Sequence, residues 1–248
     1  EKSKKILIAN KESIICGWDI INKKLSKYHT NVIPIDSEHY SIFKLLENHK
    51  FKDIEKIYIT ASGGPFLNYS KNKIKNINPE IALKHPKWKM GKKISIDSAT
   101  LMNKILEFVE AQKLFNISKD KLDILIHPES LVHAIIKFKN GLSKFIYHET
   151  SMIIPIANAI FGEKLIIKKF LKKKKQKKLD IRNLTFQKPN EKVFPIIKLK
   201  KRANEYPSTS IIINASNEVL VDHFLKKKVP FYSISKISMN ILNSENYK

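Results

Sequence analysis

Two carboxylates stand two residues apart in PIDSEH, where Asp36 and Glu38 follow a short apolar run. In an extended chain, residues i and i+2 point to the same side, so both carboxylates can address one point. Oxygen ligands of this kind suit Mg²⁺ or Mn²⁺. The same letters also fit a helix start, with Asp36 or Ser37 as the cap and a glutamate in the first turn. The segment therefore has two interpretations, a metal site and a helix cap.

A second group of reactive side chains lies in ISIDSATLMNKILEFVEA, residues 94–111. The pattern predicts a strand over 93–97 that leads directly into an amphipathic helix. Three of the side chains share one helix face, because Asn103 and Lys104 precede Glu107 by four and three residues. Donors at a helix N-terminus favour a phosphate, and Glu107 offers a third carboxylate to a metal. An ordinary Lys–Glu surface pair is the alternative. The candidate side chains are Asp97, Ser98, Asn103, Lys104 and Glu107.

The segment TASGGPF, residues 60–66, is a predicted strand end followed by two glycines and a proline. Glycines let the backbone approach a ligand closely and let N–H groups point at an anion, and Ser62 adds a hydroxyl. A plain tight turn that stops at Pro65 explains the same letters.

The segment LKHPKWKMGKK, residues 83–93, places His85, Trp88 and Met90 between lysines. One interpretation is a mobile lid whose aromatic ring closes over a substrate, with Gly91 as its hinge. The other is that Trp88 and Met90 are core anchors and His85 a residue at a helix end.

The elements that would position these groups alternate along the chain, which indicates an α/β fold. Strands over 4–10 and 31–36 flank a helix over 12–28, without the glycine fingerprint of a dinucleotide-binding unit. A helix over 37–48 with Ser37 as its cap follows. We further expect strands over 54–62, 122–127 and 130–141, a hairpin completed by 142–150, and helices over 191–205 and 213–227.

The chain has 248 residues, a formal net charge of +24 and 42% hydrophobic residues. Its lysines are spread along the whole sequence, and the densest run, at 171–180, has no interleaved aromatics of the kind that stack bases. A Lys-, Ile- and Asn-rich composition is also what an AT-rich genome produces. We therefore interpret the charge as solvated surface and expect no nucleic-acid partner. A basic nucleic-acid-binding module with structural carboxylates is kept as a rival interpretation.

No apolar run approaches the ~18 residues that a membrane span needs, so no membrane association is expected. A single cysteine, Cys16, excludes an intramolecular disulfide, and we expect it in the core. The chain opens with a charged turn that leads into a strand already inside a domain, and no element follows for the last two predicted helices to pack against. We therefore expect a true N-terminus upstream and a truncated C-terminus.

The order of these segments resembles the 1-deoxy-D-xylulose 5-phosphate reductoisomerase family, which makes 2-C-methyl-D-erythritol 4-phosphate in the non-mevalonate (MEP) isoprenoid pathway. The matches run along nearly the whole chain in family order. The segments that carry the resemblance are ANKES (9–13), DSEH (36–39), SGGPF (62–66), HPKWKMGKKISIDSATLMNK (85–104), IHPESLVHA (126–134), LTFQKP (184–189) and NASNE (214–218).

The resemblance implies an α/β catalytic domain that follows the end of a Rossmann-like domain, with a partial helical domain after it. The implied divisions are the C-terminal end of the NADPH-binding domain (1–35), the catalytic metal and substrate domain (36–161) with a mobile loop (62–91), a Lys-rich connector (162–190) and part of a C-terminal helical domain (191–248).

The resemblance also implies roles for individual residues. The implied metal ligands are Asp36, Glu38 and Glu107. The implied catalytic residues are Lys11, Glu38, Glu107 and His85. The implied substrate contacts are Lys11, Ser37, Glu38, Ser62, His85, Trp88, Ser98, Asn103, Lys104 and Glu107. The implied cofactor contacts are Asn10, Glu12, Met90 and Gly91.

The implied reaction uses a divalent cation, Mg²⁺ or Mn²⁺ with Co²⁺ as a third candidate, to polarise the substrate while its carbon skeleton rearranges. NADPH then reduces the resulting aldehyde. Trp88 would cover the substrate and exclude water. A metal-dependent sugar-phosphate isomerase or aldolase without nicotinamide is the alternative function. The family also implies a homodimer in a bacterial cytoplasm, with a plastid-type organelle as the second location.

Three positions depart from the family pattern. Ile105 stands where the family usually has glycine, and we expect a small repacking of that helix. The segment HETSMIIP (148–155) lacks the usual Pro-Asp-Met, so the end of the catalytic sheet is expected to differ locally. His133 matches a family histidine, and we interpret it as structural.

Overall fold

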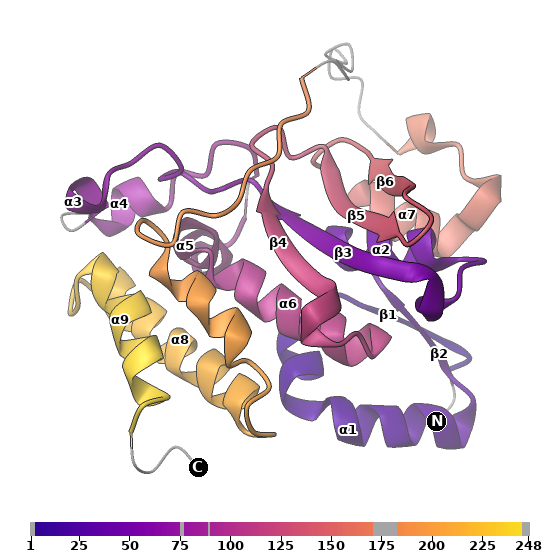
Figure 1. Ribbon diagram of the computed structural model, residues 1–248, viewed down its shortest axis with the longest axis horizontal. Coiled ribbons are helices and arrows are strands. Elements are labelled where there is room, and N and C mark those ends of the chain that lie inside the picture. The colour runs from indigo at the N-terminus through magenta and orange to yellow at the C-terminus, as the bar shows by residue number, and fades with distance from the viewer. Residues whose placement is uncertain (1–2, 75–76, 89, 171–182, 245–248) are drawn as a thin grey trace.

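The computed structural model describes residues 3–74, 77–88, 90–170 and 183–244, which form two sheets and a set of helices (Figure 1). Helix α6 runs through the middle of the molecule. It packs against α1, against the main sheet and against the C-terminal helices. A single hydrophobic core joins these parts, and Ile59, Phe108, Ile136 and Phe224 are among its buried members. The predicted α/β class is confirmed.

The first unit is a strand, a helix and a second strand, as the sequence predicts. The strands β1 (Lys5–Ile8) and β2 (Asn31–Pro34) pair in parallel, and α1 (Lys11–Tyr28) connects them. The side chain of Asn10 caps α1 by accepting a hydrogen bond from the backbone N–H of Ser13 at 2.7 Å. This cap fixes where α1 begins, and therefore where Lys11 leaves the helix.

The second unit is a four-stranded sheet with the order β4-β3-β5-β6. Strand β3 pairs in parallel with β4 and antiparallel with β5, and β5 and β6 form the predicted hairpin. Helix α6 packs against β3 and β4, and α2 packs against β5 and β6. The strand predictions for this sheet are confirmed. The bounds are β3 (Ile54–Ala61), β4 (Leu122–Ile126), β5 (Val132–Phe138) and β6 (Ser143–Tyr147).

The predicted helix after β2 is confirmed as α2 (Ser37–Leu46), but its predicted cap is wrong. Asp36 occupies the cap position and makes no capping hydrogen bond, while Ser37 is already the first helical residue. The reason is that the Asp36 carboxylate lies 3.0 Å from the ammonium of Lys11. The helix start at Asp36 with Glu38 in its first turn is therefore confirmed. The capping hydrogen bond is absent, and the extended backbone assumed in pairing Asp36 with Glu38 is wrong, because Glu38 is helical.

The predicted strand over 93–97 is wrong, because this stretch lies in the helix α5 (Lys92–Thr100). The sequence Ile-Ser-Ile-Asp alternates between apolar and polar residues, as a half-buried strand does. In the structure, however, its polar residues lie in a helix, where they are buried and hydrogen-bonded. The Ser95 hydroxyl, for example, donates to the carbonyl of Gly91 at 3.0 Å. Leu101, with φ of 65°, breaks the chain direction, and α6 (Met102–Phe115) begins directly after it.

The C-terminal part contains more helix than the sequence predicts. The predicted helix over 191–205 is a seven-residue 3₁₀ helix, η5 (Pro195–Lys201), and the one over 213–227 falls largely within α8 (Thr209–Leu225). A further helix, α9 (Phe231–Ile241), packs on α8 through Phe231 and Phe224, whose ring centroids lie 5.4 Å apart. The expectation that nothing follows for α8 to pack against is therefore wrong.

The remaining elements are short or were not predicted. Helix α7 follows the hairpin, and the densest lysine run, 171–180, lies outside the described residues. The segment after it returns to the sheet, where Gln187 bridges Ile126 of β4. The bounds are η1 (Phe51–Asp53), α3 (Lys71–Ile74), α4 (Pro79–Ala82), η2 (Lys119–Lys121), α7 (Ile153–Phe161), η3 (Gly162–Lys164) and η4 (Ile167–Lys169).

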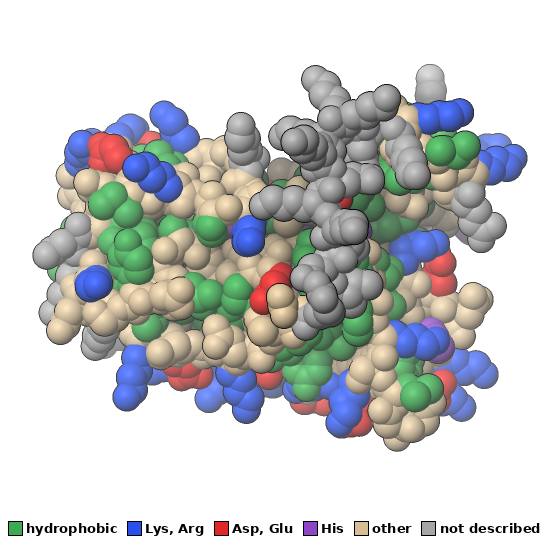
Figure 2. Space-filling view, turned by 90° about the horizontal axis from the view of Figure 1, so that it is seen from above, with side chains coloured by type: hydrophobic (Ala, Val, Ile, Leu, Met, Phe, Trp, Pro, Cys, Tyr) green, Lys and Arg blue, Asp and Glu red, His purple; other side chains and the backbone are tan. Residues whose placement is uncertain are grey.

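Two predictions about single residues can be judged from burial. Cys16 is exposed on α1, so its predicted core position is wrong; the inward face of that helix carries Ile14 and Ile15 instead. Ile105 is fully buried within the hydrophobic core. In the part of the chain that the structure describes, lysine and arginine side chains are scattered over the face seen in Figure 2, without one dominant basic patch. Among the described residues, no helix is long and apolar enough to span a membrane.

Candidate metal and phosphate site

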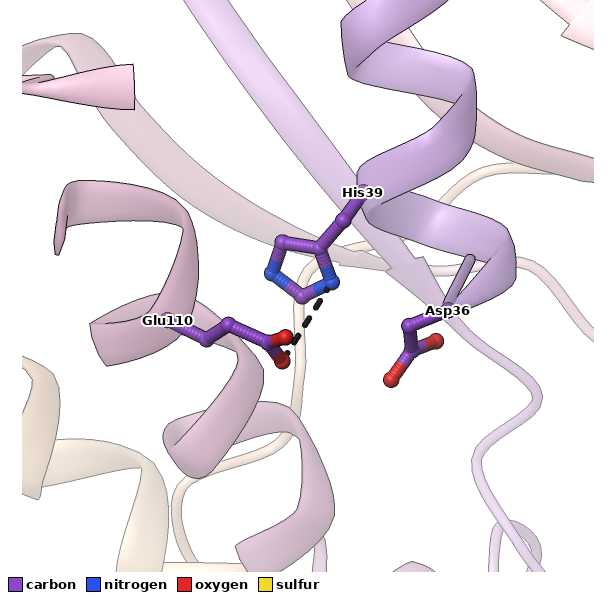
Figure 3. Close-up of side chains that lie close together, drawn as sticks. All are labelled: Asp36, His39 and Glu110. Atoms are coloured by element: carbon purple, nitrogen blue, oxygen red, sulfur yellow. Dashed lines mark ion pairs between the residues drawn. The ribbon is translucent and has the colours of Figure 1, made fainter. Parts of the chain in front are cut away.

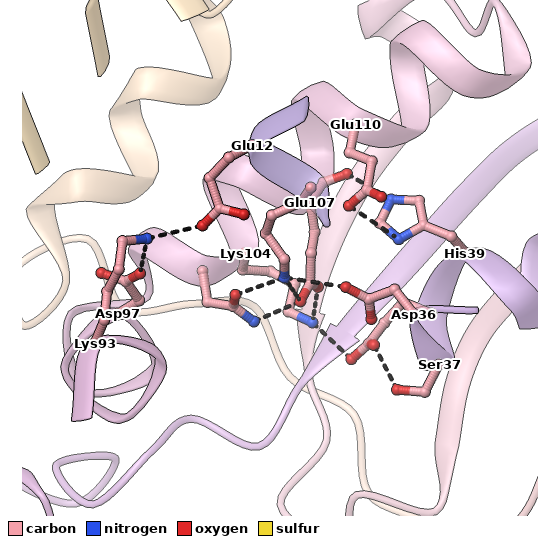
Figure 4. A network of polar contacts seen from close by, with 12 residues as sticks. Glu12, Asp36, Ser37, His39, Lys93, Asp97, Lys104, Glu107 and Glu110 are labelled. Carbon is pink, nitrogen blue, oxygen red and sulfur yellow. Dashed lines mark hydrogen bonds and ion pairs between the residues drawn. The ribbon is translucent and has the colours of Figure 1, made fainter. Parts of the chain in front are cut away.

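Three carboxylates meet where α1, α2 and α6 converge (Figure 4). Asp36 and Glu38 come from the start of α2, and Glu107 comes from the second turn of α6. Each offers one oxygen, and these oxygens all lie within 4.8 Å of one another. The structure thus brings the three sequence-predicted metal ligands together. Three anionic oxygens in one place are a donor set that fits Mg²⁺ or Mn²⁺.

Lys11 links all three elements of this cluster. Its Nζ lies 3.0 Å from Asp36 Oδ2 and 3.0 Å from Glu107 Oε1, and it donates to Asn103 Oδ1 at 2.7 Å. Burial alone lowers the pKa of Lys11, but the Asp36 and Glu107 carboxylates outweigh it and raise the pKa well above its usual value. Lys11 therefore stays charged inside the protein and neutralises part of the cluster.

Lys104 holds the other side of the cluster. Its Nζ lies 2.8 Å from Glu38 Oε1 and also contacts Glu107 Oε2. Burial opposes the charge of Lys104, yet the two glutamates raise its pKa above the usual value. The Ser37 hydroxyl donates to the second oxygen of Glu38 at 2.7 Å. Three carboxylates thus face two ammonium groups, which leaves one negative charge for an additional cation.

A second buried group, His39 and Glu110, lies beside Asp36 (Figure 3). His39 Nε2 lies 3.0 Å from the backbone carbonyl of Glu107, so it carries a proton and donates. Its Nδ1 faces Glu110 Oε2 at 3.4 Å. Burial, the largest cause, raises the pKa of Glu110 to about 7. Sequence reasoning assigned neither residue a role, although His39 is the last letter of the DSEH segment.

The residues predicted to contact phosphate lie near the point where the turn after β3 crosses α5. Gly64 has φ of 63°, and a Cβ there would lie 2.8 Å from the carbonyl oxygen of Ser98. Only glycine allows the turn after β3 to approach α5 this closely. The turn thereby places Ser62 beside the last turns of α5, which carry Ser98. The sequence predicts that Ser98, Asn103 and Lys104 lie together at the N-terminus of one helix, and this is wrong. Ser98 lies in the last turn of α5, whereas Asn103 and Lys104 lie in the first turn of α6.

Ser62 and His85 form a hydrogen-bonded pair whose proton positions follow from its partners. His85 Nδ1 accepts from the backbone N–H groups of Lys87 and Trp88, at 3.1 and 2.9 Å. His85 Nε2 therefore carries the proton and donates to Ser62 Oγ at 3.1 Å. Burial lowers the pKa of His85, which favours this neutral form. Ser62 also accepts from the N–H of Gly64, so its own proton is directed to another acceptor, such as a phosphate oxygen.

The loop that carries Trp88 rests on a stack of two histidines. The Trp88 ring meets His133 edge-on, with centroids 6.3 Å apart, and His133 stacks on His148 at 4.0 Å. Burial lowers the pKa of both histidines, and for His133 the neighbouring His148 lowers it further. The Trp88 ring therefore packs against a stacked pair of uncharged histidine rings. The mobility of this loop and the structural role of His133 stay predictions.

The four predicted cofactor contacts gather at the N-terminal ends of α1 and α5. Asn10 caps α1, Gly91 is the cap residue of α5, and Met90 precedes it. Glu12 meets α5 through Lys93, whose Nζ lies 3.0 Å from Glu12 Oε1. The structure therefore brings these residues into one region, and contact with NADPH stays a prediction.

The fold and the cluster define an α/β protein with a carboxylate-lined candidate metal centre next to serine, asparagine and lysine donors. Comparisons with known proteins agree with one family. Residues 32–115 match the model of the 1-deoxy-D-xylulose 5-phosphate reductoisomerase C-terminal domain, and residues 148–248 match that of the DXP reductoisomerase C-terminal domain. The chain belongs to the 1-deoxy-D-xylulose 5-phosphate reductoisomerase family.

Individual relatives show how much of a complete family member the chain represents. It is 51% identical to the 1-deoxy-D-xylulose 5-phosphate reductoisomerase of Pelagibacter ubique (strain HTCC1062), with 99% of this chain and 63% of that protein covered. The enzyme of Wolbachia sp. subsp. Drosophila simulans (strain wRi) is 47% identical, with 98% of this chain and 62% of that protein covered. The chain therefore spans less than two thirds of the length of these relatives.

Solved structures show the same relationship. A DOX-P reductoisomerase in complex with NADPH, fosmidomycin and magnesium superposes with a TM-score of 0.86 at 33% identity, covering 99% of this chain and 62% of that one. The Zymomonas mobilis enzyme in complex with NADPH gives a TM-score of 0.81 at 32% identity, covering 96% of this chain and 61% of that one.

Proposed function

We propose that the chain forms the metal- and substrate-binding part of an enzyme that converts 1-deoxy-D-xylulose 5-phosphate to 2-C-methyl-D-erythritol 4-phosphate with NADPH. The observation that carries this proposal is the convergence of Asp36, Glu38 and Glu107 with two buried lysines. The names of the relatives, which belong to the MEP pathway of isoprenoid synthesis, support the choice of reaction.

Asp36, Glu38 and Glu107 would hold the divalent cation, for which Mg²⁺ and Mn²⁺ are the first candidates and Co²⁺ the third. When bound, the cation supplies Lewis-acid polarisation of the substrate's carbonyl and hydroxyl oxygens. Lys11 and Lys104 neutralise the same carboxylates in the structure. Both ammonium groups therefore become available to the substrate when those carboxylates hold a cation.

The phosphate of the substrate would bind where α5 ends, α6 begins and the turn after β3 crosses them. Ser62 and Ser98 offer hydroxyl groups, Asn103 an amide, and Lys104 a positive charge. These donors suit a phosphate dianion because each supplies a proton to one oxygen. His85 holds the Ser62 hydroxyl in place through its Nε2–H. Lys11 and Ser37, at the carboxylate cluster, would address the carbonyl and hydroxyl end of the sugar.

NADPH would approach along the N-terminal ends of α1 and α5, where Asn10, Glu12, Met90 and Gly91 gather. When bound there, it would supply the hydride for reduction of the rearranged sugar phosphate. Two solved relatives are complexes with NADPH, which supports the choice of cofactor. Trp88, seated on His133, would shield the reacting atoms from water when the loop over 62–91 closes.

We further propose a homodimer in a bacterial cytoplasm. Strand β6 is an edge strand of the main sheet, and it exposes Phe145 while the neighbouring Leu142 is also exposed. An exposed edge with apolar side chains is a surface that a second chain can cover. The relatives named above are bacterial enzymes, which supports the location.

The test is NADPH oxidation by the full-length parent protein with 1-deoxy-D-xylulose 5-phosphate, with and without Mn²⁺. We expect metal-dependent oxidation and a phosphorylated polyol as product. Conversion of the substrate without any NADPH oxidation would instead support a sugar-phosphate isomerase or aldolase. A folded, Mn²⁺-binding protein that leaves both substrate and NADPH unchanged would refute the proposed reaction.

A further inference from the structure

A buried hydrogen bond ties the C-terminal helices to the helix that carries Ser98. Asn217 of α8 donates from Nδ2 to Oδ1 of Asp97 on α5 at 2.7 Å, and the two residues are 120 positions apart. Their exposed fractions are 0% and 1%, so water does not compete for this bond. Asn217 belongs to the NASNE segment, and the proposed function gives that segment no role.

The second oxygen of Asp97 extends the contact to a third element (Figure 4). Lys93 Nζ lies 3.0 Å from Asp97 Oδ2 and 3.0 Å from Glu12 Oε1 at the start of α1. One carboxylate therefore connects α8, α5 and α1. Because an isolated buried carboxylate is costly, Asp97 depends on both partners to stay charged in this position.

The two ends of this network adjoin the two halves of the proposed substrate site. Asp97 directly precedes Ser98, the hydroxyl assigned to the phosphate, and Glu12 directly follows Lys11, the ammonium held by the carboxylate cluster. A shift of α5 relative to α1 would therefore change the separation of the phosphate donors from the cluster. Substrate positioning is sensitive to displacements of this kind, on the order of 1 Å.

A second buried asparagine on α8, Asn214, does not contact Asp97 in this way. Asn214 lies three positions earlier on the same helix and is also buried, but the polar atom that its Nδ2 meets is Cys16 Sγ at 3.8 Å. Asn214 therefore reaches α1 at a residue with no place in the proposed site. It provides a matched control with the same side chain, the same helix and similar burial.

We propose that Asn217 is a positioning residue: it holds Asp97, and through it the Ser98 end of α5, at the spacing that phosphate binding requires. The inference rests on the proposed function, because it assumes that Ser98 contacts the substrate's phosphate. It makes the C-terminal helices part of substrate recognition, although none of their residues needs to touch the substrate.

The test compares two ligands on the folded 248-residue chain at fixed salt. Inorganic phosphate is titrated in the presence of Mn²⁺ and followed by calorimetry, and Mn²⁺ alone is titrated and followed by electron paramagnetic resonance. We expect Asn217→Ala to weaken phosphate binding about tenfold while Mn²⁺ affinity stays within about twofold. A merely structural residue would not move one affinity and spare the other. Asn214→Ala is expected to change neither affinity.

A second variant decides the question if Asn217→Ala does not fold. Asn217→Leu keeps the size of the buried side chain and removes the amide that donates to Asp97, so it is expected to fold and to weaken phosphate binding about tenfold. If the wild-type chain binds both ligands and the folded variant binds phosphate as the wild type does, the inference is wrong and the proposed function stands. If the wild-type chain binds neither ligand, the proposed function fails and the inference fails with it.

Discussion

At the scale of single residues, the site is a balance between three carboxylates and two lysines in a buried place. Glu107 is central to it, because one of its oxygens meets Lys11 and the other meets Lys104. Its exposed fraction is 2%, so its charge is stabilised by these partners and not by water. A substitution in this cluster should therefore change both the metal affinity and the free energy of unfolding. Whether the metal affinity rises or falls depends on whether an ammonium group or a carboxylate is removed.

Glu107→Gln removes one of the three proposed metal ligands while keeping the size of the side chain. We expect Mn²⁺ affinity to fall by at least about 100-fold, because a lost ligand should cost no less than a lost supporting contact. Electron paramagnetic resonance of Mn²⁺ measures this. Glu47→Gln, at an exposed residue after α2, is the control that should leave the affinity unchanged. An unchanged Mn²⁺ affinity in Glu107→Gln would remove the metal assignment.

Lys104→Met should move the two ligand affinities in opposite directions. The variant removes a cation that competes for Glu38 and Glu107, so Mn²⁺ should bind more tightly, whereas phosphate should bind more weakly. Without metal, the unpaired carboxylates should lower the free energy of unfolding by about 3–5 kcal/mol. Thermal unfolding with and without Mn²⁺ measures this, and Mn²⁺ should restore much of the loss. Equal melting temperatures for variant and wild type without metal would contradict the charge balance.

The raised pKa of Glu110 predicts how the stability of the protein changes with pH. Its pKa in the folded protein is raised to about 7 from 4.5, so the folded state binds the proton more tightly than the unfolded state does. Stability should therefore fall as the pH rises from about 4.5 to 7 and level off above that range. Glu110→Gln should reduce this slope and raise stability at pH 8 by on the order of 3 kcal/mol, from about 1.36 kcal/mol per pKa unit. Denaturant unfolding across pH tests it, and a slope as steep in the variant as in the wild type would refute it.

At the scale of elements, the site depends on close approaches between backbone segments. The turn after β3 crosses α5 at Gly64, and Leu101 then redirects the chain from α5 into α6. The first point brings the turn that carries Ser62 against the backbone of Ser98, and the second places Asn103 in the first turn of α6. The helix α6 adds the spacing that places Asn103, Lys104 and Glu107 on a shared face.

Gly64→Ala tests the close approach. Its Cβ would lie 2.8 Å from the Ser98 carbonyl oxygen, and the backbone angle φ is 63°. We expect a loss of about 2–4 kcal/mol in the free energy of unfolding, together with weaker phosphate binding. Gly141→Ala is the matched control, since that glycine also has a positive φ of 87° but open space around it. It should lose only about 1–2 kcal/mol, from backbone strain alone. Equal losses in the two variants would show that the approach to Ser98 does not matter.

At the scale of the whole molecule, the described part of the chain unites its sheet and its C-terminal helices in one core. Phe66, which follows the glycine turn, has its ring centroid 5.2 Å from that of Phe231 on α9. The segment that contains Thr185 also returns to the sheet, where the backbone carbonyl of Thr185 lies 2.9 Å from His127 Nδ1. The contact between Phe66 and Phe231 packs α9 against the segment after the glycine turn, which supports the inference that the C-terminal helices help to place the substrate-binding groups.

The proposed homodimer makes a prediction about the edge of the main sheet. Phe145 of β6 is 46% exposed, and Leu142 before it is 59% exposed. Replacing Phe145 with glutamate should convert a dimer into a monomer, because a charge cannot be buried at an apolar contact without a partner. Light scattering coupled to size-exclusion chromatography measures the mass. Val219→Glu, at an exposed apolar residue of α8, is the control that should leave the dimer intact. A dimer that survives Phe145→Glu would place the interface elsewhere.

Local patterns in the sequence determined the α/β order, most strands and long helices, and the identity of the three carboxylates. Spacing rules act over a few residues, so Asn103 and Glu107 could be grouped correctly on one helix face from the sequence. Asp36 and Glu38 do lie close together, but in a helix start and not in the extended segment that the i, i+2 rule assumed. The strand predicted over 93–97 failed for the same reason, because four alternating residues fit a helix as well as a strand. The helices α7 and α9 were not predicted at all.

Only the tertiary structure decided which charges meet. Lys11 reaches Glu107 across 96 positions, and Asn217 reaches Asp97 across 120. His39 and Glu110 became partners because α2 and α6 pack side by side and exclude water from both groups. Such pairings depend on how elements pack and on the burial that follows, and neither quantity is encoded in the spacing of nearby residues. The sequence therefore determined the chemical groups, whereas packing determined their partners, their charge states and the shape of the site.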